Sequence, residues 1–166
     1  YTLNDSIKNN TSKKLVIYLI DHWLDNTNKN ITAGTKDKPF LVTEKDSYEY
    51  WDAQFKAALF ISDHTAKTFR IRNAAAARAK VLYIAPSKII AVNELLKHIS
   101  GKTIVFGNNI DALNQITKNT ISSKNSEVKN ASLRKQFDEG KIKIIGSFKM
   151  LKQGANLAHL DNTVLH

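Results

Sequence analysis

From residue 86 onward, short apolar runs rich in β-branched residues alternate with amphipathic helical segments. Runs of strand length lie at 103–106, 142–146 and 163–165, with a weaker one centred on Ile121. Helical periodicity separates them, at 86–99, 110–117 and 132–137. Repeated strand–helix–strand units of this length form right-handed crossovers. The alternation therefore predicts an α/β fold over residues 86–166, with a parallel sheet covered by helices on both faces.

Ligands of such sheets bind beyond the carboxyl ends of the strands. Here those ends are the turn at 107–109, the segment after Ile121, and the segment at 147–149. A hydroxyl, backbone amides and lysines at such an edge are suitable phosphate ligands. The candidate residues are Gly107, Asn108, Ser147, Lys149, Lys152, Gln153, Gly154 and Asn156. The edge therefore predicts a binding surface without naming a reaction.

Several of these residues also have an ordinary structural interpretation. Lys149, Lys152 and Gln153 fit a solvated helix face equally well. Gly154 could allow close approach to a phosphate or a sugar, or it could end a helix. Asn156 could hydrogen-bond a ribose or cap the next turn. The residues alone leave these alternatives open.

The first 85 residues follow a different pattern and predict a mainly helical segment. One helix is expected to begin at Ser47, with Trp51 and Phe55 four residues apart on one face. A second is expected from about His64 to Tyr83. Leu15–Leu24 is compatible with a buried strand or a helix, and 26–38 predicts a loop. The chain thus divides near residue 85.

The charge of the chain is strongly positive and uneven. The 166 residues have a formal net charge of +10. Residues 80–166 hold 13 basic against 6 acidic residues, and 12 of the 13 are lysine. A basic domain usually has an anionic partner, and lysine favours contact with the phosphate backbone over contact with base edges. Nucleic acid is the expected partner, and a merely soluble basic surface is the alternative.

Composition also excludes several classes of protein. There is no cysteine, which excludes disulfides and thiolate metal sites. No apolar run approaches the roughly 20 residues that a membrane helix needs. The first residues lack the layout of a signal peptide. We therefore expect a cytoplasmic protein that does not bind membranes.

No complete catalytic motif is visible. Ser100-Gly101-Lys102-Thr103 resembles the end of a P-loop, but Leu96 stands where the first glycine would be, and a helix precedes it instead of a strand. The five histidines lack metal-ligand spacing. No nucleophile elbow or pair of carboxylates stands out. We expect no catalytic residues and no metal site in this chain.

Taken in order, residues 86–166 resemble the second RecA-like lobe of superfamily-two helicases and translocases. Lys102–Asn108 is similar to motif IV, and Ser132–Phe137 resembles a helix in which Arg134 and Phe137 keep the family spacing. Residues 144–147 and 153–157, followed by 161–165, are similar to motif V. The nearest likeness of the whole region is to phage and bacterial DEAD/DEAH-like helicases and to Swi/Snf-type ATPases. Two departures are Ser147, where the family usually has threonine, and the end at His166 before motif VI.

The resemblance implies roles for the candidate residues. Gln153, Gly154 and Asn156 would face the nucleotide, whereas Gly107, Asn108, Ser147, Lys149 and Lys152 would face nucleic-acid phosphates. Arg134 and Phe137 would join helix to sheet. ATP and Mg²⁺ would bind in the parent enzyme, mainly through the first RecA-like lobe. Without a phosphate loop or an arginine finger, the isolated chain is expected to bind ATP weakly and not to hydrolyse it.

The functional hypothesis is therefore a fragment of an ATP-dependent helicase or translocase, acting on DNA more than RNA and partnered by the first lobe. In this scheme residues 1–85 are an inter-lobe segment or an insertion. The alternative is a non-catalytic basic α/β module that binds nucleic acid. A third possibility is a small-ligand domain in which the N-terminal helices form a lid.

Overall fold

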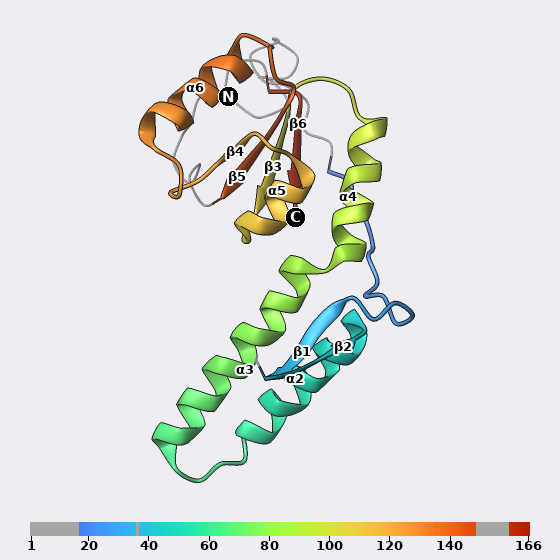
Figure 1. The fold of residues 1–166 in the computed structure, drawn as a ribbon, viewed down its shortest axis with the longest axis vertical. Helices are drawn as coiled ribbons and strands as arrows, with labels where there is room; N and C mark the ends of the chain where they lie inside the picture. The colour runs from blue at the N-terminus through green and yellow to red at the C-terminus, as the bar shows by residue number, and fades with distance from the viewer. Residues whose placement is uncertain (1–16, 36, 149–159) are drawn as a thin grey trace, which may run out of the picture.

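The computed structural model describes residues 17–35, 37–148 and 160–166 (Figure 1). The N-terminal elements are β1 (Ile31–Thr35), β2 (Lys38–Val42), α2 (Glu44–Ala58) and α3 (His64–Ile84). The elements that follow are α4 (Pro86–His98), β3 (Thr103–Gly107), α5 (Ile110–Ile116), β4 (Thr120–Ile121), α6 (Glu127–Asp138), β5 (Ile144–Phe148) and β6 (Asn162–Leu165). Across these described ranges, no helix is both long and apolar enough to cross a bilayer.

The second half forms one four-stranded sheet in the order β4-β5-β3-β6, and every pairing is parallel. In the central pair, Thr103 lies opposite Ile144 and Gly107 lies opposite Phe148. Helices α4, α5 and α6 flank this sheet (Figure 1). The predicted α/β architecture with a parallel sheet is confirmed.

Two apolar clusters hold the helices to opposite faces of the sheet. Ile104 and Ile145 pack with Phe137 of α6. Val105, the next residue of β3, packs instead with Val92 of α4 and Leu113 of α5. Successive residues of a strand point to opposite faces, so one apolar run supplies both clusters. This explains why the run at 103–106 is apolar throughout instead of alternating.

Local side chains fix where the helices begin. Asn109 caps α5 by accepting a hydrogen bond from the Ala112 amide at 2.9 Å, and Ser126 caps α6. The cap of α6 thus lies six residues before the predicted cap Ser132, and the helix begins at Glu127. Similarly, Thr43 caps α2, which begins at Glu44 instead of Ser47.

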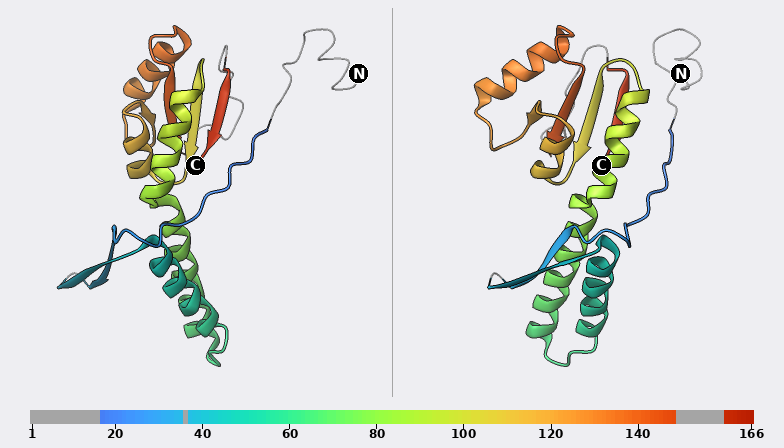
Figure 2. Two further views of the ribbon diagram at one scale, coloured as in Figure 1. Left: turned by 90° about the vertical axis from the view of Figure 1, so that its right-hand side faces the viewer. Right: turned by 45° about the vertical axis from the view of Figure 1, so that its right-hand side comes forward.

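The N-terminal half is a helical hairpin with a β-hairpin beside it. Helices α2 and α3 run side by side, and the β1–β2 ribbon projects from them (Figures 1 and 2). The predicted loop at 26–38 is wrong in part, because it contains β1. Gly34 lies within β1 with a φ of 88°, a conformation that favours glycine, and Pro39 is tolerated opposite it because a two-stranded ribbon has only edge strands.

The segment from Ile17 to Leu24 belongs to no helix or strand. Its large apolar side chains are exposed, among them Tyr18, Leu19 and Trp23. The predicted choice between a buried strand and a helix is therefore wrong for the described part of 15–24. The polar helical turn expected after Phe148 lies outside the described residues.

Candidate functional site at the carboxyl edge of the sheet

The carboxyl ends of three strands meet at one edge of the sheet. Phe106 lies opposite Ser147, and Gly107 lies opposite Phe148, across the β3–β5 pair. On the other side of β3, the backbone amide of His166 donates to the Phe106 carbonyl at 2.8 Å. The structure thus brings Gly107 and Ser147 together at this edge. Their roles in binding stay predictions.

Gly107 has a packing reason to be glycine. A Cβ atom there would lie 2.9 Å from Cγ of Leu113, in the helix that follows β3. The missing side chain lets α5 pack closely against the sheet, whatever the edge binds. Asn108 is exposed beyond it and is free to meet a ligand, whereas Asn109 is engaged in capping α5.

Ser147 is fully buried, with 0% of its surface exposed. It lies two residues after Ile145 and so faces the α6 layer. Its Oγ has no hydrogen-bond partner among the described residues, and burying an unpaired hydroxyl costs about 1–3 kcal/mol. A phosphate at the edge would reach this hydroxyl only if the α6 layer opened.

The other predicted site residues lie outside the described residues. These are Lys149, Lys152, Gln153, Gly154 and Asn156.

A buried carboxylate at the start of α2, which sequence reasoning missed, lies close to this edge. Glu44 is fully buried and accepts hydrogen bonds from the amide of Asp25 at 3.1 Å and from the amide of Ser87 at 2.9 Å. It also accepts from the Ser87 hydroxyl and, at 3.4 Å, from the Asn30 amide group. Helix α4 begins at Pro86 without a side-chain cap of its own, so Glu44 caps it from 43 residues away.

Three basic side chains gather beside this cap. Lys88 of α4 is half-buried, and His166 at the end of β6 is 8% exposed. His22 is exposed, and its Nε2 lies 3.0 Å from the Ser87 hydroxyl. Burial, followed by the charges of Lys88 and His22, lowers the pKa of His166 to about 4. We call Lys88, His166 and His22 the α4 basic cluster.

No local signal in the sequence indicated the α4 basic cluster. Its members stand more than 60 residues apart, and they meet only because β6 pairs with β3 beneath α4. Only the position of Lys88 could be predicted, since it lies in the first turn of a helix that the sequence predicted correctly.

The lysine of the apparent P-loop has a structural role at the opposite edge. The Nζ atom of Lys102 donates to the Asp138 carbonyl at 2.8 Å and lies 5.7 Å from the centre of the Phe137 ring. A cation suits this position because the carboxyl end of a helix is partially negative. Phe137 is fully buried in the core, which confirms the structural position predicted for it.

Other possible sites are few. Within the part of the chain that the structure describes, no group of three or more His, Asp or Glu residues could hold a metal ion. Two hollows of about 280 and 510 Å³ lie in the N-terminal half, away from the sheet. The first is lined by α2 and α3, and the second lies between α2 and the β1–β2 ribbon.

No family model and no curated protein matches the chain. Among solved structures, it is similar to the Pyrococcus furiosus Hef helicase domain, with a TM-score of 0.41 and 15% sequence identity. That match covers 71% of this chain but only 29% of the other. A TM-score this low does not establish a common fold. The α/β assignment therefore rests on the strand order and register described above.

Proposed function

We propose that this chain forms part of the second RecA-like lobe of an ATP-dependent nucleic-acid helicase or translocase. In this proposal, the carboxyl edge of the sheet contacts the phosphate backbone. The first RecA-like lobe of the same parent protein binds ATP and Mg²⁺ and supplies the phosphate loop. Gln153, Gly154 and Asn156 complete the nucleotide cleft, as the motif resemblance implies.

The placement of unpaired lysines at the carboxyl edge carries the nucleic-acid part of this proposal. Lys88 lies in the first turn of α4, and Lys124 follows the carboxyl end of β4. Neither makes an ion pair or a side-chain hydrogen bond with the described residues. The ammonium group is a point charge that suits phosphates and does not read base sequence. Sequence-independent contact is what a motor that moves along a strand requires.

ATP turnover by the protein made from its complete reading frame tests the proposal. Hydrolysis is measured alone and with single-stranded DNA, double-stranded DNA and RNA, beside a Gly154→Asp variant. We expect turnover that nucleic acid stimulates and that the aspartate abolishes, because its charge would repel the nucleotide phosphates. Unstimulated turnover, or a variant with full activity, would contradict the proposal.

The alternative is a non-catalytic module that binds nucleic acid through the same edge. The α4 basic cluster favours it, because an ammonium group and imidazole N–H groups can bind backbone phosphates without any nucleotide. Salt-sensitive binding to DNA without hydrolysis under any condition would support this second reading. Tight binding of a small molecule, with no salt-sensitive binding to DNA, would support neither.

A further inference from the structure

The first turn of α4 covers an imidazole whose two nitrogens are both unsatisfied. Val164 of β6 packs in the apolar cluster beneath α4. His166 lies two residues further along the chain, so its side chain points to the same face of the sheet as that of Val164. The ring of His166 is therefore directed at the first turn of α4. It is 92% buried, and neither Nδ1 nor Nε2 has a hydrogen-bond partner among the described residues. Buried polar groups of native proteins rarely stay unpaired, so both nitrogens are available to a ligand.

Lys88 adds a positive charge that makes no ion pair with the described residues. Its ammonium group also makes no hydrogen bond with any residue that the structure describes, and burial lowers its pKa. The carboxylate at this junction, Glu44, is already engaged by donors from Asp25, Asn30 and Ser87. A half-buried cation beside a buried imidazole costs free energy, and an anion bound between them would offset it.

His22 completes the arrangement from the opposite side. Because the Ser87 hydroxyl donates its proton to Glu44, it accepts from Nε2–H of His22. His22 is exposed and lies on a segment without regular structure, so its ring can turn toward a ligand. Three nitrogen-bearing side chains thus face one turn of one helix.

We propose that Lys88, His166 and His22 bind a phosphate group at the first turn of α4. The Lys88 ammonium and an N–H group of His166 donate to the phosphate oxygens, and the N–H group of His22 joins them when its ring turns away from Ser87. His166 forms the floor of the site, and His22 forms its exposed rim. This inference rests on the proposed function, in which Lys88 belongs to the surface that contacts phosphates, and it names the residues of one phosphate site on that surface.

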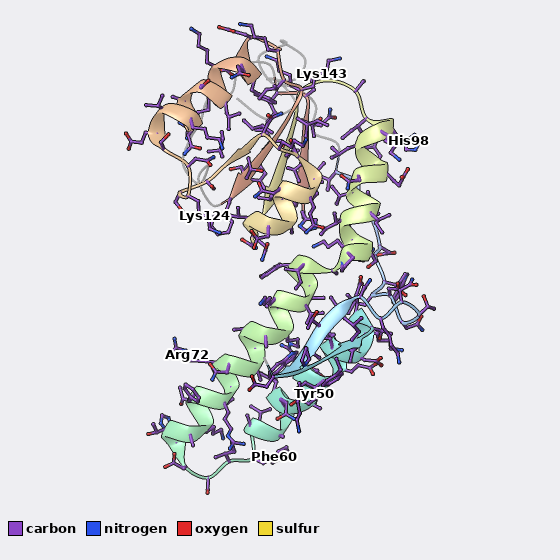
Figure 3. The ribbon with its side chains drawn as sticks, in the orientation of Figure 1. Tyr50, Phe60, Arg72, His98, Lys124 and Lys143 are labelled. Carbon is purple, nitrogen blue, oxygen red and sulfur yellow. The ribbon has the colours of Figure 1, made fainter. Side chains whose placement is uncertain are left out.

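Inorganic phosphate is the first probe. Its binding to the whole 166-residue chain is measured by NMR of the histidine side chains. We expect phosphate to shift the His166 and His22 resonances and to raise the pKa of His166, because the anion offsets the Lys88 charge. Lys88→Met should weaken phosphate binding by tenfold or more. Lys143→Met removes an exposed charge from the opposite edge of the sheet and should leave binding unchanged (Figure 3).

The melting temperature separates a binding role of Lys88 from a structural one. Methionine keeps the length of lysine and removes a half-buried charge, so Lys88→Met should melt at the same temperature or higher. His22→Gln, on the exposed segment, provides a second variant and should weaken phosphate binding several-fold. An unchanged His166 resonance, or equal losses in Lys88→Met and Lys143→Met, would overturn the proposal.

Two further titrations identify the source of the phosphate. One uses adenosine monophosphate, and the other uses an oligonucleotide of about 20 nucleotides without terminal phosphates. If Lys88→Met weakens binding of the oligonucleotide, the site holds a backbone phosphate. If it weakens binding of the mononucleotide alone, the site holds a terminal phosphate. If Lys88→Met weakens the binding of neither the oligonucleotide nor the mononucleotide, the proposed site is overturned, even if the protein hydrolyses ATP.

Discussion

His166 makes the stability of this protein depend on pH. The pKa of the buried ring is lowered from 6.5 to about 4, mainly by burial and then by the charge of Lys88. As the pH falls below 6.5, the unfolded chain binds a proton before the folded chain does. The contribution of neutral His166 is therefore complete above pH 6.5 and is lost between pH 6.5 and 4. We expect the free energy of unfolding to fall by roughly 2 kcal/mol over this range.

Urea unfolding at a series of pH values measures this loss. His166→Gln should remove most of the dependence between pH 6.5 and 4, because glutamine does not titrate. His98→Gln is the matched control, since His98 is exposed at the end of α4 and should leave the profile unchanged (Figure 3). A profile unaffected by His166→Gln would show that other groups cause the dependence.

A single methyl group at Gly107 tests how tightly α5 packs on the sheet. The Cβ of Gly107→Ala would meet the Leu113 side chain at 2.9 Å, and Leu113 is fully buried. Because neither the helix nor the strand can yield freely, we expect a loss of about 1–3 kcal/mol in the free energy of unfolding. Asn108→Ala, at the exposed neighbouring position, should change it by less than about 0.5 kcal/mol. Equal effects at both positions would contradict this packing.

At the scale of elements, one carboxylate joins the starts of α2 and α4. Glu44→Gln keeps the shape of the side chain but places an amide group against the Ser87 donors. At least one buried donor then loses its acceptor, so we expect a loss of about 1–3 kcal/mol in the free energy of unfolding. Chemical denaturation of the chain measures it.

Glu49→Gln is the control for this change, one turn further along α2. Glu49 is exposed and pairs with Lys45 at 3.8 Å, a contact worth less than about 1 kcal/mol. If both variants lost the same stability, the cap from Glu44 to α4 would not matter to the fold. A larger loss of stability in Glu44→Gln than in Glu49→Gln would make Glu44 the link between the N-terminal half and the sheet.

Some elements could be predicted from their own residues and some could not. Helix α4 begins at Pro86 as predicted, because proline suits the first helical position. The ribbon at 31–42 was missed, since its stability comes from pairing between two short strands and not from either strand alone. The predicted start of α6 at Ser132 was late, because Ser126 and Ser132 are equally good caps by type.

At the scale of the whole molecule, binding to nucleic acid should depend steeply on salt. Each phosphate contact of a single strand releases counter-ions and contributes about −0.7 to the slope of log affinity against log salt concentration. We expect Lys124→Met, at the carboxyl edge, to make this slope shallower by about one contact. Fluorescence anisotropy with a labelled oligonucleotide measures it.

Lys143→Met is again the control, because Figure 3 places Lys143 and Lys124 at opposite ends of the sheet. The two variants have the same net charge, so a general charge effect would change both slopes equally. Only a local contact of Lys124 at the carboxyl edge would make the salt dependence of the two variants differ. Equal slopes would assign binding to the whole basic surface.

The layered architecture of the second half could be predicted from its own residues. Each element of this half shows its type in its own residues, as the apolar runs around Ile104 and Ile145 and the amphipathic helix at Phe137 do. Hydrophobic periodicity over a few residues is therefore enough to predict a parallel sheet with helices. The carboxyl edge followed from that sheet, and with it the candidate positions Gly107 and Ser147.

The surroundings of those positions depend on packing between distant parts of the chain and could not be predicted. Burial turned the Ser147 hydroxyl inward, and strand pairing brought His166 under Lys88, 78 positions away in the chain. Periodicity reports which face of an element is apolar, but not which distant polar groups meet at its end. Such meetings depend on strand order and helix placement, and these arise only when the whole chain packs.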